Sequence, residues 1–479
     1  MKQTHERELK FHIEPRFRLP ELPGTPLRPR VFTSTYFDSL DHRLAHMGVT
    51  LRRRVERRKS AWQLKLPENA ARLELEMPGP PGHPPDAMRD LLTAYTRGRD
   101  LVPVARLRTL RTGLRVRAGG APVAEVVIDT VTALDGRRVV GRFRELEVEL
   151  LEVGDEAILG RIADTLRVAG ATDSDGRPKV FQVLGLELPK PPPPVAADAP
   201  AIEHLTAMLG KRLQEVLVHD PGTRRGVDPE DLHRMRVAVR RLRALLRAAK
   251  PMLRRKWVRK LRNRLEWLGD ALGPVRDLDV LRDYLKSEAA ALARAEQLAL
   301  KPLLDALAAE RARAQVRMLD ALRSPRYGRL LERLEEAVER PRVVMADVAL
   351  RAIAAEEYMR LQRSVLGHGP APTGEELHAT RIQGKRARYA AELAEAAVGP
   401  AATAFIRAAK EVQDILGEHQ DAAVAEDRIR QFVLHARDRR VLAAADKLIE
   451  RQRARRQTAR AALPAAWAEL DARGREVWL

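Results

Sequence analysis

The sequence predicts a multidomain α+β protein, β-rich in its N-terminal half and all-α in its C-terminal half. Before residue 188, apolar and charged residues alternate in twos, as in Leu73–Met77 and Leu146–Leu150, which is the periodicity of strands. After residue 200, long segments rich in Ala, Leu, Arg and Glu recur with helical spacing and few glycines. A proline run lies between the halves and predicts a stiff linker. The 479 residues therefore divide into a domain at 1–188, a linker at 189–200 and a domain at 201–479.

Composition limits the chemistry that the chain can carry. It has no cysteine, so any metal is held by oxygen or imidazole ligands, which favours Mg²⁺ or Mn²⁺. A formal net charge of +21 indicates an anionic partner, for which nucleic acid, anionic lipid and polyphosphate are candidates. The N-terminus lacks the apolar core of a secretion signal, and no apolar stretch is long enough to span a bilayer. We therefore expect a cytoplasmic protein without a membrane partner.

Charged residues occupy the alternate positions of the predicted strands and are sorted by strand into acidic and basic sets. In a strand, residues two apart project from the same face, so Glu6, Glu8 and Lys10 converge. The same parity relates further residues: Arg52 with Arg54, Gln63 with Lys65, Glu74 with Glu76, Glu125 with Asp129, and Glu145 with Glu147 and Glu149.

Two interpretations of this charged face are open. A solvated sheet would also show charges, but it usually mixes them with Ser, Thr, Asn and Gln. If the sheet instead closes with this face inward, unpaired charges would cost several kcal/mol each unless a charged ligand compensated them. Carboxylates bind hard cations while Lys and Arg bind phosphate oxygens, so a polyphosphate with a divalent metal fits the second interpretation.

These residues together resemble the CYTH domain, also called the triphosphate tunnel metalloenzyme fold. The resemblance covers about residues 2–188 and rests on an ordered set of motifs: Glu6-x-Glu8-x-Lys10, Tyr36-Phe37-Asp38, Leu51-Arg52-Arg53-Arg54, Trp62-Gln63-Leu64-Lys65 and Glu145-Leu146-Glu147-Val148-Glu149. It implies an eight-stranded antiparallel tunnel that binds a linear triphosphate and cleaves its terminal phosphoanhydride with Mg²⁺ or Mn²⁺.

The resemblance also implies roles for individual residues. The catalytic residues would be Glu6, Glu8, Lys10, Glu147 and Glu149. The metal ligands would be Glu6, Glu8, Glu147, Glu149, Glu74, Glu76 and Asp129. The phosphate-binding residues would be Lys10, Arg52, Arg54, Lys65, Arg111, Arg115 and Lys179. Five arginines of residues 105–117 compete for a place in the tunnel, so the register of this segment stays open.

The helical half repeats itself. The pattern His233-x-x-Arg236-x-x-x-Arg240-x-x-Arg243 returns as His378-x-x-Arg381-x-x-x-Lys385-x-x-Arg388. Each copy is followed by an echo, Leu272-Gly273-x-x-Arg276-Asp277 and then Leu416-Gly417-x-x-Gln420-Asp421. The spacing indicates an internal duplication, with halves at about 201–345 and 346–479. Two copies predict a pseudo-twofold bundle of antiparallel helices.

In each copy the basic residues step by three and four onto one helical face. A single basic face is more often solvated than functional, but its repetition favours a binding site. The motifs resemble the CHAD domain, which implies a basic cavity that binds inorganic polyphosphate. The residues expected to bind it are His233, Arg236, Arg240, Arg243, Arg247, His378, Arg381, Lys385 and Arg388.

The resulting expectation is a triphosphatase that hydrolyses inorganic triphosphate in its N-terminal tunnel and binds long-chain polyphosphate through its helical domain, in association with polyphosphate granules. Three alternatives stay open. The tunnel could be idle and the chain a polyphosphate scaffold, or the tunnel could act as an adenylate cyclase or a thiamine triphosphatase. Nucleic-acid binding is the third, although aromatic residues near the arginine runs are scarce apart from Trp257 and Trp267.

Overall fold

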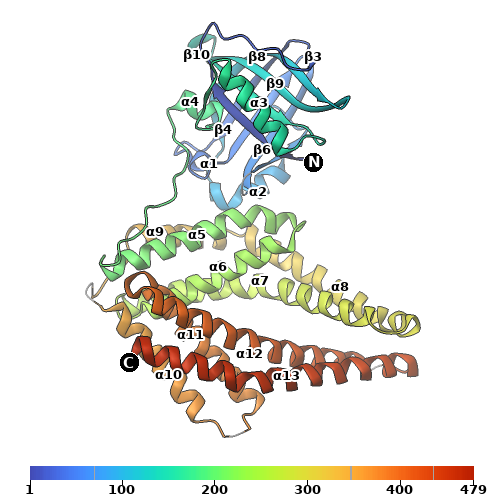
Figure 1. The fold of residues 1–479 in the computed structure, drawn as a ribbon, viewed down its shortest axis with the longest axis vertical. Helices are drawn as coiled ribbons and strands as arrows, with labels where there is room; N and C mark the ends of the chain where they lie inside the picture. Colours follow the sequence, from blue (N-terminus) through green and yellow to red (C-terminus); the bar gives the residue numbers. More distant parts are fainter. Residues whose placement is uncertain (69–70, 346–347, 370, 435) are drawn as a thin grey trace. The chain divides into compact units, whose positions relative to one another are not determined.

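The computed structural model describes residues 1–68, 71–345, 348–369, 371–434 and 436–479. The chain forms two compact units, Met1–Pro191 and Pro192–Leu479, and the boundary falls inside the proline run. An N-terminal antiparallel sheet is followed by a helical region, which confirms the predicted fold class (Figure 1). Among the described residues, no helix combines the length and the apolar composition needed to cross a bilayer.

The first unit is built on one sheet. In the described residues its strands are β1 (Lys2–Glu6), β2 (Glu8–His12), β3 (Gly24–Pro26), β4 (Arg30–Asp38), β5 (Thr50–Glu56), β6 (Lys59–Glu68), β7 (Ala71–Met77), β8 (Val102–Ala118), β9 (Ala121–Asp135), β10 (Arg138–Leu150) and β11 (Thr172–Asp173). Its helices are α1 (Arg43–His46), α2 (Asp86–Thr96), α3 (Glu156–Val168) and α4 (Lys179–Leu184).

The sheet closes on itself through the first strand of the chain. The strand order is β1-β7-β6-β5-β4-β8-β9-β10-β2-β11, and every pairing is antiparallel. β1 pairs with β7 and β2 pairs with β10, yet only Arg7 separates β1 from β2. The Leu150 amide donates to the Arg7 carbonyl at 2.9 Å, which continues the ladder across the break. The two ends of the sheet therefore meet at Arg7.

The strand count differs from the predicted eight. Eight strands do make up the closed ring when β1 and β2 are counted as one interrupted strand. The sheet has eleven because Arg7 splits that strand and because two short strands are added: β3 pairs with β8, and β11 pairs with β2. Neither short strand carries a period-two pattern long enough to be read from the sequence.

Local sequence explains how the ring and its cover form. Gly119 and Gly120 have φ values of 57° and 84°, which a two-residue hairpin turn requires, and they join β8 to β9. The Asp155 carboxylate accepts a hydrogen bond from the Ile158 amide at 2.7 Å and so begins α3. The apolar face of α3 packs on the outward-facing side chains of the sheet, among them Leu146 and Val148. The charged face of the strands is consequently the inner one.

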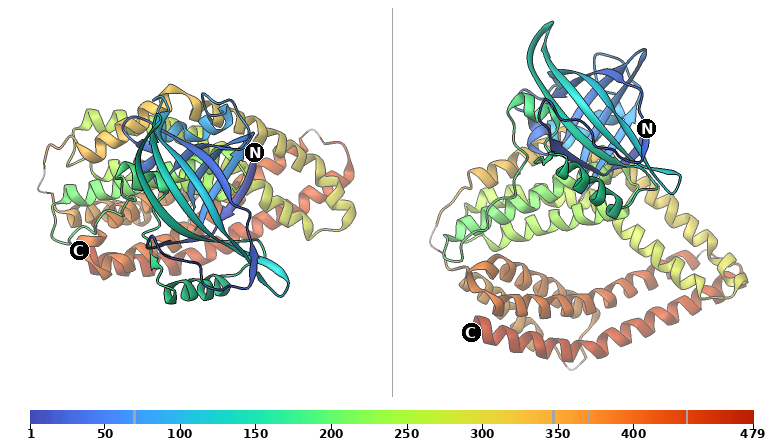
Figure 2. Two further views of the ribbon diagram at one scale, coloured as in Figure 1. Left: turned by 90° about the horizontal axis from the view of Figure 1, so that it is seen from above. Right: turned by 45° about the horizontal axis from the view of Figure 1, so that its top comes forward.

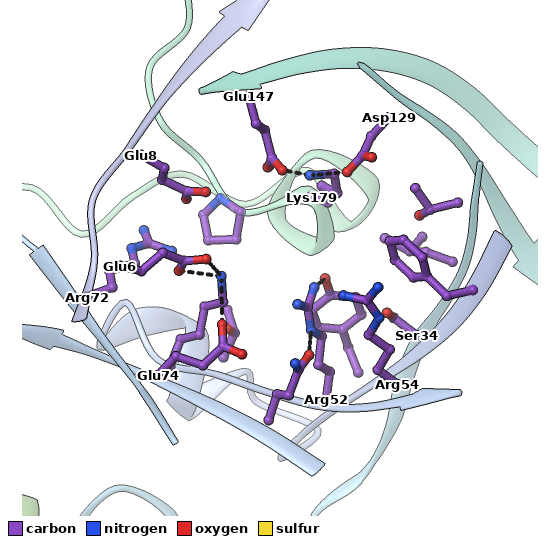
Figure 3. Close-up of a pocket in the computed structure, with 18 of the residues that line it drawn as sticks. Glu6, Glu8, Ser34, Arg52, Arg54, Arg72, Glu74, Asp129, Glu147 and Lys179 are labelled. Carbon is purple, nitrogen blue, oxygen red and sulfur yellow. Dashed lines mark hydrogen bonds and ion pairs between the residues drawn. The ribbon is translucent and has the colours of Figure 1, made fainter. Parts of the chain in front are cut away.

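Helix α4 packs its apolar side chains against the inner face of the ring. Val180 and Phe181 are buried against Leu107, Val131 and other side chains of the inner face. Lys179, the first residue of α4, is buried as well and points toward the acidic strands (Figure 3). The helix thus fills part of the ring with apolar side chains and adds a cation to the charged part.

The second unit is helical throughout its described residues, apart from one isolated bridge between Leu253 and Val343. Its helices are α5 (Ala201–Arg225), α6 (Pro229–Ala248), α7 (Arg255–Ala290), α8 (Arg294–Arg323), α9 (Pro325–Glu339), α10 (Leu350–Leu366), α11 (Gly374–Val398), α12 (Pro400–Val433) and α13 (Arg439–Trp478).

The helices of the second unit repeat in chain order, so that α5 to α8 correspond to α10 to α13, and α9 is an addition to the first half. Within each half, consecutive helices pack against each other. Between the halves, α6 packs against α11 and α8 packs against α13, so equivalent helices meet (Figure 2). The two repeated helices begin with polar caps, Asp228 before α6 and Thr373 before α11. This arrangement places the two histidine-led stripes on helices that touch.

Candidate active site and polyanion-binding surface

The inner face of the ring encloses a polar cavity of about 130 Å³. Nearly every strand of the ring contributes to its wall, and α4 contributes Pro178 and Lys179 at its start. The charged residues that line it are Glu6, Glu8, Lys10, Arg52, Arg54, Lys65, Arg72, Glu74, Arg111, Asp129, Glu147, Glu149 and Lys179. Because these residues come from segments far apart in the sequence, closure of the sheet is what brings them together.

Asp129 and Glu147 form a wall whose charge is already compensated. Arg111 donates to both oxygens of Asp129, at 2.8 and 2.7 Å, and to Glu147 at 2.7 Å. Lys179 lies 2.5 Å from Glu147 and 3.1 Å from Asp129, which is fully buried. Burial would raise the pKa of Glu147, but Lys179, Lys10 and Arg111 together hold it well below its ordinary value. Glu147 therefore stays ionised, and Glu147 and Asp129 together fix Lys179 in this wall (Figure 3).

In a second acidic group, formed by Glu6, Glu8 and Glu149, only Glu149 lacks such compensation in the described part of the chain, because Lys65 contacts Glu6 and Lys10 lies 3.5 Å from Glu8. Glu6, Glu8 and Glu149 lie on neighbouring inner positions, since Glu8 pairs directly with Glu149. Lys65 contacts Glu6 at 2.5 and 2.6 Å, whereas Glu149 has no ion-pair or hydrogen-bond partner among the described residues. Burial, followed by repulsion from Glu6, raises the pKa of Glu149 to about 7. Burial also raises the pKa of Glu6. This part of the cavity carries excess negative charge.

The donor chemistry of this second group fits a hard divalent cation. All of its donors are carboxylate oxygens, which Mg²⁺ and Mn²⁺ prefer, and a cation there would reverse the repulsion that raises the pKa of Glu149. Within the described ranges, no three acidic or imidazole side chains are already gathered around a common point. Lys65 instead occupies the oxygens of Glu6, and it also lies 3.3 Å from Glu74.

The opposite side of the cavity is basic (Figure 3). Arg52 donates to the Gln63 side-chain oxygen at 2.8 Å and to the Tyr36 hydroxyl at 3.2 Å. The Arg54 guanidinium lies over the Phe32 ring, 3.7 Å from its centroid. Burial lowers the pKa of Arg54, and its neighbours Arg52 and Arg111 lower it further. An anion bound between these guanidinium groups would relieve that repulsion.

The structure brings together all but two of the residues assigned to the N-terminal site. Arg115 lies outside the cavity, where it is 46% exposed and pairs with Glu125 at 2.6 Å. Glu76 does not line the cavity either, and its carboxylate accepts a hydrogen bond from Gln63 at 2.7 Å. Both have the inward parity of their strands, but they lie beyond the part of the strand that borders the cavity.

Several polar residues of the site were not assigned from the sequence. Ser34, Tyr36, Gln63 and Arg72 line the cavity, and the buried Glu145 contacts Lys179 at 2.7 Å. Each of these residues lies an even number of positions from other inward-facing residues of its strand, so the alternating pattern places it on the inner face. That signal could have found Arg72, two residues before Glu74, and Glu145, two before Glu147. Ser34 and Tyr36 are uncharged, so charge sorting gave no signal for them.

In the second unit the two histidine-led stripes face each other. Burial, followed by repulsion from Arg381, Arg240, Arg388 and Arg236, lowers the pKa of Lys385 to about 7. These cations come from both copies, so α6 and α11 present their basic faces to one another. The Arg381 Nε atom is buried and has no acceptor among the described residues. Such a group of cations is suited to an anion with several charges.

The echo motifs supply acidic partners to the stripes. Asp277 lies 2.8 Å from Arg236, and Asp421 raises the pKa of Arg381 although burial lowers it overall. Each aspartate follows a glycine by four residues, and a Cβ on Gly273 would reach the Arg236 guanidinium at 3.9 Å. The aspartates of the echo motifs therefore orient the arginines of the stripes.

The two leading histidines have different surroundings. His233 is half-buried, and burial and repulsion from Arg276 lower its pKa. His378 is exposed and contacts Gln420 at 3.3 Å.

Further along the same face lies a cationic group of which the sequence identified only Arg247. Burial lowers the pKa of Arg247, and repulsion from Arg386 adds to it. Arg262 and Lys250 belong to the same group. Repulsion from Arg247 lowers the pKa of both, and Arg262 also lowers the pKa of Lys250. Arg386 follows Lys385 directly and so did not fit the three-and-four spacing of the stripe. Arg243 and Arg388 pair with Glu266 and Glu392, so the stripe is partly neutralised between the two groups.

Comparisons with known proteins agree with this division. The CYTH domain family matches residues 4–173 and the CHAD domain family matches residues 207–430. CYTH domains are metal-dependent. The uncharacterized protein Rv2226 of Mycobacterium tuberculosis is 30% identical over 487 residues, which cover 90% of this chain and 89% of that protein.

Solved structures resemble the helical unit. The structure of PptA from Streptomyces chartreusis has a TM-score of 0.48 and 23% identity, covering 56% of this chain and all of PptA. The CHAD domain of the plant Ricinus communis has a TM-score of 0.48 and 26% identity, covering 58% of this chain and 94% of that domain. From the two consecutive domain matches and the relative that spans nine tenths of both chains, the chain belongs to the family in which a CYTH domain is followed by a CHAD domain.

Proposed function

We propose that the N-terminal unit hydrolyses inorganic triphosphate and that the helical unit binds inorganic polyphosphate. The observation that carries the first part is the cavity in which a group of carboxylates that includes Glu149, which has no partner among the described residues, faces a basic wall. A linear triphosphate with a divalent cation matches this pairing of charges. The aromatic side chains in the wall, Phe32 and Tyr36, already contact Arg54 and Arg52, so we assign the cavity to the phosphate chain and not to a base or a thiamine ring.

The residues of the cavity divide the work. Oxygens of the phosphate chain are bound by Arg52, Arg54 and Lys65. Additional positive charge around the chain comes from Lys10, Arg111 and Lys179. Asp129 and Glu147 hold Arg111 and Lys179 in place, so these cations do not reorganise when charge develops on the reacting phosphate. Tyr36 and Gln63 do the same for Arg52.

Glu6, Glu8 and Glu149 would hold the divalent cation, Mg²⁺ or Mn²⁺. Bound there, such a cation would supply charge neutralisation at the phosphate oxygens and would lower the pKa of an attacking water. Water adds to the terminal phosphorus and the bond to the bridging oxygen breaks, which yields phosphate and pyrophosphate. Burial of the charged side chains in the cavity strengthens the electrostatic interactions among them.

Phosphate release tests the first part of the proposal. The full chain with Mg²⁺ or Mn²⁺ should release phosphate from inorganic triphosphate, and Glu6→Ala plus Glu8→Ala should reduce the rate at least about 100-fold. Glu14→Ala plus Glu21→Ala is the matched control, because both residues are exposed in the same unit and lie outside the cavity. Wild-type turnover in the Glu6/Glu8 variant, or no release from any triphosphate, would count against the assignment and favour a polyphosphate scaffold.

The second part rests on the convergence of Arg236, Arg240, Arg381 and Lys385 between α6 and α11. Linear polyphosphate has closely spaced charges and no bases, so it matches a group of cations without aromatic side chains. Such binding would place the protein at polyphosphate deposits in the cytoplasm. Arg381→Ala plus Lys385→Ala should weaken retention of long-chain polyphosphate at least tenfold, whereas Arg351→Ala plus Lys410→Ala, at exposed positions, should not. Displacement by duplex DNA at equal charge concentration would contradict the assignment.

A further inference from the structure

A groove of about 680 Å³ runs beside the start of α7, in the second unit. Its floor is apolar, with Leu253, Trp257, Val344 and Met345, and the last two are 65% and 57% exposed. A smaller hollow shares Trp257, Lys260 and Arg342 with it, so Trp257 lies where the two meet. The volume is within the usual range of small-molecule sites, which are concave and mostly apolar.

The rim of this groove is strongly basic. Six cations line it, Lys250, Arg254, Arg255, Lys256, Lys260 and Arg342, and no acidic residue does among the described ones. Arg254, Arg255, Lys256 and Lys260 have no carboxylate partner in the described part of the chain, and Arg342 reaches Glu336 only at 3.5 Å. Burial lowers the pKa of Lys250, as does repulsion from Arg262 and Arg247. The rim therefore has positive charge that no described residue neutralises.

Trp257 is free to stack. In the described residues it makes no ring contact, cation–π contact or hydrogen bond, whereas Trp267 on the same helix lies under the Arg326 guanidinium at 4.2 Å. The backbone around the groove is fixed: the Arg254 amide donates to the Arg342 carbonyl and the Val344 amide to the Met252 carbonyl, both at 2.9 Å. An indole held at a rigid, basic groove offers a face for a planar ring and charges for an attached anion.

We propose that this groove binds a nucleotide, with the base against Trp257 and the phosphates against the rim around Lys256 and Lys260. Inorganic polyphosphate does not account for the apolar floor, because it has no surface to bury there. An anionic membrane does not account for the concavity, because a bilayer is flat on this scale. A nucleotide matches both the aromatic floor and the charged rim.

The test measures the anisotropy of an ADP analogue labelled on its ribose, directly excited, with the full chain in EDTA and excess inorganic tripolyphosphate. Without a divalent cation the N-terminal cavity should not hold the analogue, and the tripolyphosphate occupies the α6–α11 cations, so binding that persists belongs elsewhere. We expect saturable binding that Trp257→Ala weakens at least tenfold and Trp257→Phe, which keeps an aromatic face, weakens less than threefold. Trp267→Phe is the matched tryptophan control and should bind as the wild type does.

Charge is tested separately, so that a folding defect of Trp257→Ala cannot decide the outcome. Lys256→Glu plus Lys260→Glu changes two exposed residues and should also weaken binding at least tenfold, while Lys211→Glu, exposed on α5 and outside the groove, should not. Absent binding, displacement by tripolyphosphate, or unchanged affinity in Trp257→Ala would each overturn the proposal. Sedimentation with phosphatidylglycerol vesicles that requires Trp257, without nucleotide binding, would assign the groove to a lipid surface instead.

Discussion

At the scale of single residues, Glu149 shows how a site can be unfavourable to the fold that contains it. Its pKa of about 7 lies above the ordinary value of 4.5, because it is buried and close to Glu6. The folded protein therefore binds this proton more tightly than the unfolded chain does. The free energy of unfolding falls as the pH rises from 4.5 through 7. Above pH 7, Glu149 is ionised and its full destabilisation of the folded state is present.

We predict that Glu149→Gln stabilises the metal-free protein at pH 8 by about 1–3 kcal/mol and abolishes most metal-dependent phosphate release. At pH 5 the stabilisation should shrink, because wild-type Glu149 is then protonated. Thermal unfolding of the full chain in EDTA at both pH values checks the sign. An equal gain in stability at pH 5 and pH 8 would show that Glu149 does not titrate between them.

Lys385 is the cationic counterpart in the helical unit. Its pKa, lowered to about 7 by burial and by four arginines, means that it is mostly neutral at pH 8 when no anion is bound. A bound polyanion would favour its charged form, so binding at pH 8 should take up about one proton per site. Affinity for polyphosphate should then fall as the pH rises above 7.

Calorimetry of polyphosphate binding in buffers of different ionisation enthalpy measures this uptake. Lys385→Met should abolish most of the uptake and weaken binding, while stabilising the unliganded helical unit. Arg351→Met, at an exposed position, serves as the control. Uptake that persists unchanged in Lys385→Met would mean that another group carries the proton.

At the scale of elements, the cavity depends on close pairing of β8 with β9 beside Arg111. A Cβ at Gly113 would lie 2.1 Å from the Val126 carbonyl oxygen and 2.8 Å from Val127 Cα, both backbone atoms that cannot move aside cheaply. Gly113 is two residues from Arg111, which holds Asp129 and Glu147. Only glycine fits the close approach of these two strands.

We therefore predict that Gly113→Ala lowers the free energy of unfolding of the first unit by about 2 kcal/mol or more and reduces phosphate release. Gly141→Ala, in the neighbouring strand β10, is the control, since its Cβ would meet only Ala133 Cβ at an ordinary 3.8 Å. Denaturant unfolding and phosphate release of the two variants make the comparison. Equal stability of the two variants would contradict the packing argument.

The same elements show what the sequence could and could not predict. Strand parity identified most of the inward charges, because an alternating pattern fixes the face of a residue. It could not tell how far along a strand the cavity extends, so Arg115 and Glu76 share the inward parity yet lie outside it. The first strand was recognised by Glu6, Glu8 and Lys10, but its break at Arg7 depends on pairing with β7 and β10, which are distant in the chain.

In the helical unit, the sequence repeat identified both basic stripes but did not predict that the helices carrying them pack against each other. The contact of α6 with α11 joins segments more than a hundred residues apart, and no local period encodes it. For the same reason Arg262 and Arg386 were missed, because they complete the group around Arg247 only through tertiary packing. Likewise, Trp257 appeared in the sequence as an isolated aromatic residue, and only the pairing of residues 252–254 with 342–344 makes it the floor of a groove.

At the scale of the whole molecule, the two proposed phosphate sites differ in their balance of charge. In the first unit the cations are largely matched by carboxylates, so a triphosphate needs its divalent cation to bind. In the second unit the facing stripes are in excess, so an anion can bind without a metal. The proposed function would therefore combine a site for a short, metal-bound substrate with a site for a long, metal-free polymer. A tether between such sites raises the effective concentration of one ligand near the other site.

The division at Pro191 and Pro192 leads to the last prediction. Each unit has its own buried core, and the proline run between them cannot continue a strand or a helix. We expect fragments 1–191 and 192–479 to fold separately, with phosphate release from triphosphate in the first and polyphosphate retention in the second. Chelation of the metal should stop release by fragment 1–191 and leave polyphosphate retention by fragment 192–479 unchanged. Circular dichroism, phosphate release and retention, each compared with the full chain, check this, and loss of either activity in its fragment would mean that the units complete one another.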